Sequence, residues 1–479
     1  MQVLVDLVWE HPVTRPRPPV SWLTDEERAV ELQRAQQQHA RTTAYEAELI
    51  MSMAAARPAT DDPAPGTPGA RRPGWAVDEG YGGPSEFFTA ELSAVLNVGR
   101  GTAAYRYARA HTWLTKLPQT FAALAAGELD ERRAAQLAEV LQHTSPEVAG
   151  QVEAALLPEA TELSVTRLKA RATELMVQLD AAAADERRKE AAKAADVHLY
   201  PSASDGQATL AADLPAEEAV ECYDIVDQLA KMLKANGDPR RIGALRAHVL
   251  SLLIRRPADH GLPHVTANVT VTADLDSLGG TGDSAGEVSG LPITAGHVRD
   301  LLARVGALGL TAPEGGTLSF AVTGPNGQLL ATLTPAELTR LARRGCTTHP
   351  DRECACPIAG PPPETDAYEP TDRQRAFLTT RDRRCRFPNC GQRVGWTDLD
   401  HVIPHDRGGP TDCANLCCLC RSHHRLKTFA PGWRFAMTPD GVLQVTTPSG
   451  VTRTTRPPGM RPPPAPQPQP PPDDDPPPF

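Results

Sequence analysis

The chain lacks both a long apolar run and a basic N-terminal flank. No stretch approaches about 18 uninterrupted apolar residues, the length that a membrane-spanning helix needs. The first residues, MQVLVDLVWEHPVTRPRP, carry acidic and proline interruptions where a secretory signal would carry positive charge and then an apolar core. We therefore expect a soluble, cytoplasmic protein without a membrane partner.

Cysteine is scarce outside one segment. Nine of the ten cysteines lie between Cys346 and Cys420, and Cys222 is the exception. A disulfide framework is rarely so uneven, and in a reducing compartment such a cluster indicates metal binding. Cys222 falls on a predicted helix, where a cysteine is more often a core residue than a reactive one.

The chain as a whole has no excess of positive charge, but one segment of it does. The net charge of -10 argues against a protein that coats nucleic acid uniformly. Between Thr371 and Phe435, however, twelve Lys and Arg side chains stand against six Asp side chains. A basic segment in an acidic chain is the pattern expected for a polyanion partner.

The N-terminal part of the sequence predicts a long helix followed by a linker. Thr24 and Glu27 have the spacing of a capping box, and the residues after them are good helix formers up to about Arg57. Residues 58–84 are rich in proline and glycine, which can sustain neither a helix nor a strand ladder.

The central part of the sequence combines helices with short hairpins. Apolar residues at helical spacing predict four or five helices between Ser85 and about Ala195. Alternating stretches around Asp205-Gly206 and Asn326-Gly327 predict hairpins, and a further strand is expected near residue 270. The Gly/Ser-rich residues 278–290 are expected to form a loop.

The stretch Leu92–Ala110 resembles a helix-turn-helix. Gly99 would lie in the turn, and Arg106 and Arg109 would lie on the second helix. Such matches are common in Ala-rich helical proteins, so a plain helical hairpin is the favoured interpretation over a DNA-reading helix.

Metal-ligating residues are concentrated in residues 385–427. Cys385 and Cys390 form a knuckle-like pair, and Cys420 and His423 follow at the start of a predicted helix. Two thiolates from a turn and a Cys/His pair from a helix are typical of a tetrahedral zinc site. Because protein would fill all four positions, we expect this zinc to be structural and to stabilise a domain with little core of its own.

Four further polar residues have no part in that zinc site: Asp400, His401, Asn415 and His424. Adjacent helical residues point about 100° apart, so His424 faces a different side from His423. Asp400 and His401 lie at the end of a predicted strand and diverge. One of them can therefore bind an ion while the other handles a proton.

This run of residues resembles the HNH nuclease motif of the ββα-metal fold. The resemblance covers roughly Asp382 to Phe429 and rests on the knuckle cysteines, DHVIPHDRGG, Asn415 and LCRSHHRLK. His423 stands where many HNH proteins have a second cysteine. The region from Ser85 to about Pro370 resembles a helix-rich domain of unknown function, the type numbered 222, which precedes HNH modules in many high-GC bacterial proteins. This second resemblance rests on LPQTFAALAAGELDERRAAQLAEVL and LARRGCTTHPDRECACP.

The resemblance implies a role for each residue. His401 would be the general base that activates water, and Asp400 and His424 would hold one catalytic Mg²⁺ or Mn²⁺ ion. Asn415 would orient His401 or brace the loop between the strands. Phosphodiester cleavage needs an activated water and charge stabilisation on the phosphate, and this set of groups provides both.

Several nearby residues have other expected roles. Arg407, Arg425 and Lys427 are placed by sequence to contact backbone phosphates. His405 is a weaker candidate for the base than His401, and a phosphate contact or surface position suits it better. Cys413, Cys417 and Cys418 exceed the need for ligands. A second zinc site is an open alternative for the remaining set, Cys346, His349, Cys354 and Cys356.

The sequence thus predicts an α+β protein, and its expected parts are as follows. They are a lead and long helix (1–57), a flexible linker (58–84), a helix-rich domain with β-hairpins (85–345), a Cys/His-rich linker (346–370), a zinc-stapled ββα-metal HNH domain (371–455) and a disordered Pro-rich tail (456–479). The predicted function is metal-dependent DNA endonuclease activity.

Two other functions stay open. One is a zinc-folded, DNA-binding regulator or mobile-element accessory protein that does not cleave. The other is a helical protein-interaction scaffold.

Overall fold

The structure is a computed structural model, and it describes most of the chain. The described residues are 19–64, 66–70, 83–180, 186, 189, 192–193, 195–202, 206–255, 271–272, 286–288, 291–304, 319–323, 327–334, 337 and 360–460. The chain divides into two compact units, residues 1–187 and 188–479. Among the described helices, none is long and apolar enough to span a membrane.

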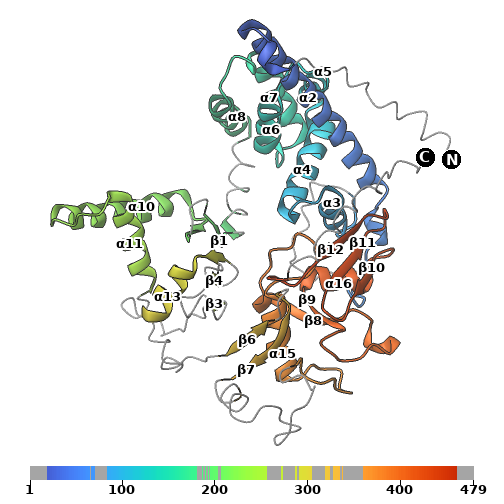
Figure 1. Cartoon of the computed structure of the whole chain (residues 1–479). Helices are drawn as coiled ribbons and strands as arrows, with labels where there is room; N and C mark the ends of the chain where they lie inside the picture. The colour runs from blue at the N-terminus through green and yellow to red at the C-terminus, as the bar shows by residue number, and fades with distance from the viewer. Residues whose placement is uncertain are drawn as a thin grey trace, which may run out of the picture. The chain divides into compact units, whose positions relative to one another are not determined.

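The first unit is helical (Figure 1). Its helices are α2 (Asp25–Ala55), α3 (Phe88–Leu96), α4 (Arg100–Lys116), α5 (Pro118–Ala126), α6 (Glu131–Leu141), α7 (Pro146–Leu156) and α8 (Val165–Leu179), with the short 3-10 turns η1 (Val20–Trp22), η2 (Ala59–Asp61) and η3 (Leu157–Glu159). The capping box of Thr24 and Glu27 begins α2, as the sequence predicts. Six helices lie between residues 85 and 180, one or two more than expected.

The long helix α2 belongs to the core of this unit. Its residues Ala40, Ala44 and Ile50 are buried in one apolar cluster with Trp113 and Leu137. Trp113 is fully buried, and its indole Nε1–H donates to the Ala134 carbonyl oxygen at 2.9 Å. We expected a domain boundary at residue 57, but α2 shares one apolar core with the helices that contain Trp113 and Leu137.

The two ends of the predicted linker lie together. Pro58 and Pro84 form an antiparallel bridge, and the Ala59 N–H donates to the Gly83 carbonyl oxygen at 2.8 Å. The Ser85 hydroxyl donates to the Asp62 carboxylate at 2.5 Å. These contacts bring the two described ends of residues 58–84 together directly before α3.

The first part of the second unit consists of hairpins and helices. Its elements are β1 (Val197–Pro201), β2 (Ala208–Ala212), α10 (Ala216–Ala235), α11 (Ile242–Arg255), β3 (Val271–Thr272), β4 (Gly286–Val288), β5 (Leu291–Ile293), α13 (Ala295–Arg304), β6 (Phe320–Thr323) and β7 (Leu329–Leu333). β1 pairs with β2 and β6 with β7, both antiparallel, which confirms the two expected hairpins. Gly206 and Gly327 have φ of 68° and 78° in the turns.

Two expectations for this region are wrong. The segment expected to be a loop contains β4, which pairs with β3 and β5 in a small antiparallel sheet. Cys222 is exposed on α10 instead of buried. A single cysteine on a helix does not reveal which face of that helix is covered.

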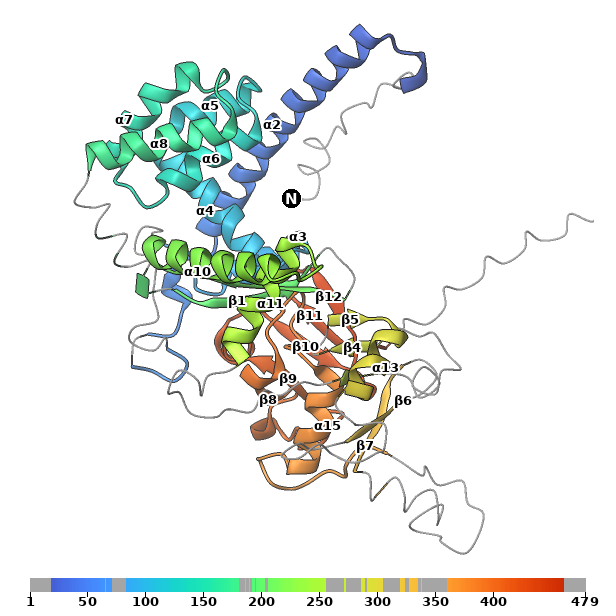
Figure 2. The same ribbon diagram turned by 90° about the vertical axis from the view of Figure 1, so that its left-hand side faces the viewer.

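The C-terminal part of the second unit holds the predicted ββα arrangement, whose strands β8 and β9 are labelled in Figure 2 and whose helix α16 is labelled in Figure 1. Its elements are α15 (Asp372–Asp382), η6 (Val394–Trp396), β8 (Thr397–His401), η7 (His405–Arg407), β9 (Leu416–Cys420), α16 (Arg421–Phe429), β10 (Arg434–Met437), β11 (Leu443–Thr446) and β12 (Thr452–Thr455). β8 and β9 pair antiparallel, with Thr397 opposite Cys420 and His401 opposite Leu416. α16 begins directly after β9. The α+β fold class is thereby confirmed.

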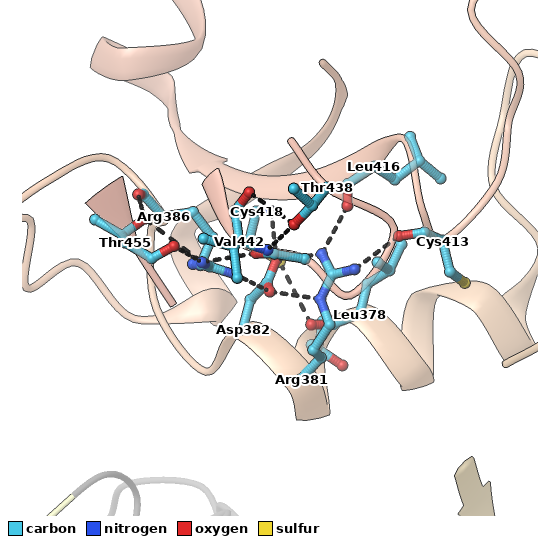
Figure 3. A network of polar contacts seen from close by, with 12 residues as sticks. Leu378, Arg381, Asp382, Arg386, Cys413, Leu416, Cys418, Thr438, Val442 and Thr455 are labelled. Carbon is cyan, nitrogen blue, oxygen red and sulfur yellow. Dashed lines mark hydrogen bonds and ion pairs between the residues drawn. The ribbon is translucent and has the colours of Figure 1, made fainter. Parts of the chain in front are cut away.

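A buried charge network joins the parts of this domain (Figure 3). The Arg381 guanidinium donates to the Asp382 carboxylate at 2.8 Å and to the Leu416 carbonyl oxygen at 2.7 Å. Arg386 donates to Asp382 at 3.0 Å and to the Thr455 carbonyl oxygen at 2.8 Å. Since α15, β9 and β12 all supply partners, the network holds the β10–β12 sheet against the ββα unit.

Candidate metal centre and active site

The four residues predicted to bind zinc come together. The ligand atoms of Cys385, Cys390, Cys420 and His423 all lie within 4.8 Å of one another. The His423 Nδ1 atom is 3.1 Å from the Cys420 Sγ atom and 3.5 Å from the Cys385 Sγ atom. One metal ion at the centre of such a group would have four protein ligands, so the cluster has the chemistry of a closed structural site.

Local structure fixes the knuckle in place. The Cys385 N–H donates to the Gln392 carbonyl oxygen at 2.7 Å, and the Cys390 N–H donates to the Phe387 carbonyl oxygen at 3.1 Å. Asn389 between them has a φ of 60°, in the left-handed region that Asn tolerates. The turn thus directs both thiols toward the start of α16.

Burial and mutual hydrogen bonding decide the protonation of these thiols. Burial raises the pKa of Cys385 above its ordinary value. Hydrogen bonds from the Cys385 and Cys390 thiols lower the pKa of Cys420. A divalent cation at the centre of the cluster would stabilise the thiolate form of all three cysteines.

Asp400 and His424 meet on the other side of α16. The His424 Nε2 atom lies 3.6 Å from the Asp400 Oδ1 atom. Two ligand atoms each about 2.1 Å from one ion are about 3.0 Å apart at a right angle and about 4.2 Å apart on opposite sides. The observed separation falls between these limits, so the pair fits a divalent cation.

Two additional residues surround this pair. The His424 Nδ1 atom is 2.8 Å from the Asp398 Oδ2 atom. The Lys427 Nζ atom is 3.2 Å from Asp400 Oδ1 and 3.1 Å from Asp400 Oδ2. The side chains of Lys427 and Asp400 are both nearly buried. The Lys427 ammonium group forms an ion pair with the same carboxylate that would ligate a metal ion.

His401 lies beside this pair with its imidazole largely enclosed. Its Nε2 atom is 2.9 Å from the Thr411 hydroxyl. Burial lowers the pKa of His401, the charge of His405 lowers it further, and the charge of Asp400 opposes both. The ring is therefore neutral at neutral pH, the form that can accept a proton. If Nε2 carries the ring hydrogen and donates it to Thr411, Nδ1 is the basic nitrogen.

A short segment before α15 covers the His401 ring. Tyr368 stacks on His401 with ring centroids 5.4 Å apart, and it meets His405 edge-on at the same distance. Thr365 and Thr411 form an antiparallel bridge. The buried Gln374 amide donates to the Thr411 carbonyl oxygen at 2.8 Å, which ties α15 to the residue that contacts His401.

Asn415 braces the loop between the strands. Its Oδ1 atom accepts from the Ile403 N–H at 2.9 Å, and its Nδ2 donates to the Ile403 and Pro410 carbonyl oxygens at 3.0 and 2.9 Å. Of its two predicted roles, these bonds match the bracing of the loop and not a direct contact with His401.

The three predicted phosphate contacts have different surroundings. Arg407 is exposed at the end of η7. Arg425 is buried, at 8% exposure, and Lys427 pairs with Asp400. Arg381 and Arg386 belong to the basic segment counted in the sequence, but both are buried and pair with Asp382. They therefore do not contribute to an exposed basic surface.

Asp398, Thr411 and Tyr368 were not recognised from the sequence. A signal existed for Asp398, because residues two apart on a strand share a face and so Asp398 lies on the same side as Asp400. The contacts of Thr411 and Tyr368 with His401 depend on loop conformation. The extra thiols Cys413, Cys417 and Cys418 are buried, and burial raises the pKa of Cys417 to about 12.

The remaining sequence candidates lie elsewhere. The possible second zinc site at Cys346, His349, Cys354 and Cys356 falls outside the described residues. α3 and α4 form the helical hairpin, with Arg106 paired to Glu46 at 2.8 Å and Arg109 to Glu131 at 2.7 Å. These pairs hold the hairpin to α2 and α6, which agrees with a structural role.

Comparison with known proteins finds two family models that match different parts of the chain. A model of the "Domain of unknown function (DUF222)" matches residues 29–324, and a model of the "HNH endonuclease" matches residues 385–429. The chain belongs to the DUF222 family and carries an HNH domain. The HNH match begins at the first knuckle cysteine and ends with α16, so it contains the Cys/His cluster as well as Asp398, Asp400, His401 and His424.

Relatives that match 74–78% of this chain are found in Mycobacterium tuberculosis. "Uncharacterized protein Rv3776" is 30% identical over 391 residues, which cover 78% of this chain and 70% of the relative. "Uncharacterized protein Rv2100" is 28% identical over 391 residues, covering 74% of this chain and 66% of the relative. No solved structure matches the chain.

Proposed function

We propose that this DUF222–HNH protein is a metal-dependent endonuclease that hydrolyses DNA phosphodiester bonds. One observation supports the proposal most strongly. The Asp400 Oδ1 and His424 Nε2 atoms lie 3.6 Å apart, beside the neutral, enclosed imidazole of His401. A carboxylate, a metal-ligating histidine and a proton acceptor in one place are what phosphodiester hydrolysis requires.

Each residue has a distinct part in this function. Asp400 and His424 hold one Mg²⁺ or Mn²⁺ ion, which supplies charge stabilisation on the scissile phosphate when bound. His401 accepts the proton of the attacking water on Nδ1, while Thr411 fixes the ring through Nε2. Asn415 holds the loop that carries Thr411, so it acts through loop geometry.

The Cys/His cluster serves the fold. Cys385, Cys390, Cys420 and His423 hold a structural Zn²⁺ ion, because three thiolates and an imidazole form a preferred donor set for zinc. His423 ligates through Nδ1, and its ring stacks on Phe387 with centroids 3.9 Å apart. The zinc thereby fixes α16 and the direction in which the neighbouring His424 points.

DNA is held mainly by charge. Arg407 is exposed next to the loop of His401 and suits a backbone phosphate. Lys427 pairs with Asp400 and would supply positive charge to a phosphate held at this site. Arg425 was included in this set from the sequence, but its burial favours a contact within the domain.

A non-cleaving DNA-binding protein is the second candidate, and one observation favours it. The Lys427 ammonium lies within 3.2 Å of both Asp400 oxygens, so a resident cation already balances the carboxylate that the catalytic ion needs. A site in which Lys427 excludes the ion would bind DNA without cutting it.

Cleavage of supercoiled plasmid with Mg²⁺ or Mn²⁺ distinguishes the two functions. The wild-type protein should nick or linearise the plasmid, and His401→Ala should lose cleavage with an unchanged zinc content. His405→Ala is the matched control, since its ring lies 5.5 Å from that of His401, and it should keep cleavage. Cleavage by His401→Ala at the wild-type rate would refute the assigned base. Salt-sensitive binding without cleavage under any divalent ion would establish the second candidate.

A further inference from the structure

The imidazole of His424 has a carboxylate at each of its two nitrogen atoms. Its Nδ1 atom is 2.8 Å from Asp398 Oδ2, and its Nε2 atom faces Asp400 Oδ1 at 3.6 Å. Asp398 and Asp400 are two residues apart on β8, so both carboxylates project from the same face of the strand, toward α16. His424 therefore lies between two carboxylates that meet different nitrogens.

We propose that Asp398 is a positioning residue that fixes the tautomer of His424, with the hydrogen on Nδ1 and the lone pair of Nε2 directed to the ion at Asp400. The proposal rests on the proposed function, because that function places the ion at Asp400 and His424. Asp398 itself does not bind the ion in this arrangement, since it faces the opposite edge of the ring.

The chemistry of neutral imidazole explains the need for such a residue. One ring nitrogen carries hydrogen and the other carries the lone pair, and only the nitrogen with the lone pair can bind a metal. A carboxylate accepts hydrogen bonds and donates none, so it selects the tautomer with hydrogen on Nδ1. Removing such an outer partner of a ligating histidine typically weakens metal affinity about 10- to 100-fold.

Asp398 has a second partner that supplies a matched control. The Arg421 Nη1 atom is 3.1 Å from the same Oδ2 atom that His424 contacts. If Asp398 served only as a surface ion pair for α16, loss of Arg421 and loss of Asp398 would have similar effects. If Asp398 fixes the tautomer, only the loss of Asp398 affects the ion.

The test compares Asp398→Ala, Asp398→Asn and Arg421→Ala in the full zinc-loaded chain. Nitrogen-15 NMR of the imidazoles reports which nitrogen of His424 carries hydrogen, and Mn²⁺ titration reports the ion affinity. Zinc content checks that each variant is folded.

The expected result is an Nδ1–H tautomer in the wild-type protein and mixed tautomers in Asp398→Ala, with Mn²⁺ affinity about 10- to 100-fold lower. Asp398→Asn should recover part of the affinity, because the amide oxygen still accepts from Nδ1–H. Arg421→Ala should resemble the wild type in both readouts.

Three results would overturn the proposal: an Nε2–H tautomer in the wild type, unchanged Mn²⁺ affinity in Asp398→Ala, or an equal loss in Arg421→Ala. The tautomer is read without DNA. A wild-type protein that shows the Nδ1–H tautomer and loses Mn²⁺ affinity on Asp398→Ala, yet cuts no DNA, would refute the nuclease and keep the positioning role.

Discussion

Asp400, His401 and His424 show how one strand and one helix can supply different chemical roles to neighbouring residues. Asp400 faces α16 and His424, whereas His401 contacts Thr411 in the loop between the strands. His423 and His424 separate in the same way, one toward the thiols and one toward Asp400. Helix periodicity therefore separates His423, in the Cys/His cluster, from His424 at Asp400, and strand periodicity separates Asp400 from His401.

The spacing of residues in the sequence was sufficient to predict the Cys/His cluster. The four residues of the Cys/His cluster follow from the knuckle and the Cys/His pair, because metal geometry limits the spacings that work. The pairing of Lys427 with Asp400 did not follow from sequence, where Lys427 had the character of a surface cation. A side chain's charge is visible in the sequence, but its partner depends on tertiary structure.

Gly409 gives a sharp prediction for the loop that carries Thr411. A Cβ atom at Gly409 would lie 1.9 Å from the Ile403 carbonyl oxygen, which is backbone and cannot move aside cheaply. Gly409→Ala should therefore displace the loop, lowering both plasmid cleavage and the melting temperature of the HNH domain.

The neighbouring Gly408 is the control. Its φ is 81°, and a methyl group added there would meet no atom within 4 Å, so Gly408→Ala should cost only about 1–2 kcal/mol of backbone strain. Equal effects of the two substitutions on cleavage would show that steric space at Gly409 is unimportant.

At the scale of elements, the HNH domain depends on polar contacts as well as on metal. One of its apolar clusters holds Phe377, Leu378, Cys413 and Leu416, and the buried apolar residues outside that cluster include Phe387, Leu419, Leu426 and Leu443. The buried network of Arg381, Asp382 and Arg386 adds contacts among α15, β9 and the β10–β12 sheet. The sequence predicted the ββα unit, but not this network or the C-terminal sheet, since isolated Arg and Asp residues look alike whether exposed or buried.

Asp382→Asn should destabilise the domain strongly. It leaves two buried guanidinium groups without a counter-charge, and breaking a buried pair in this way typically costs about 3–5 kcal/mol. Chemical denaturation followed by tryptophan fluorescence measures the change, because Trp433 packs against Phe387 in this domain. Asp406→Asn, at an exposed position, should leave the free energy of unfolding nearly unchanged, and a similar loss in both variants would contradict the role of the network.

The same network predicts the direction of a pH effect. Burial alone would raise the pKa of Asp382, but the charges and hydrogen bonds of Arg381 and Arg386 outweigh it and lower the pKa. A carboxyl group with a lowered pKa stabilises the fold above its unfolded pKa of about 3.9, and this stability is lost as the pH falls through the folded pKa. The difference in unfolding free energy between wild type and Asp382→Asn should thus be constant near neutral pH and shrink below about pH 4. A difference that grows toward low pH would contradict the assignment.

At the scale of the whole molecule, the two compact units differ in what stabilises them. The helical unit has an extended apolar core with Trp113 and several leucines fully buried, whereas the HNH domain combines buried apolar residues with a Cys/His cluster that could hold a metal ion. The DUF222 match, residues 29–324, extends across the division between the units at residue 187. Composition and periodicity predicted the helices and the domain at the C-terminal end, but where a chain divides depends on long-range contacts that periodicity does not contain.

Removal of zinc should therefore affect the two units differently. A strong chelator should unfold the HNH domain, because binding of a structural metal contributes directly to folding, and should leave the helical unit folded. Far-UV circular dichroism should retain a cooperative helical melting transition after chelation, while the tryptophan signal of the HNH domain is lost. Loss of all helical signal on chelation, or no change in either signal, would contradict this account.

We infer that a closed zinc site at the Cys/His cluster and an open site at Asp400 and His424 lie on different sides of α16. Metal analysis combined with Mn²⁺ titration of wild type and Asp400→Asn separates the two sites. Both proteins should hold one tightly bound zinc per chain, and only the wild type should bind one exchangeable Mn²⁺ and cleave plasmid. Wild-type Mn²⁺ affinity in Asp400→Asn, or loss of its zinc, would refute this division.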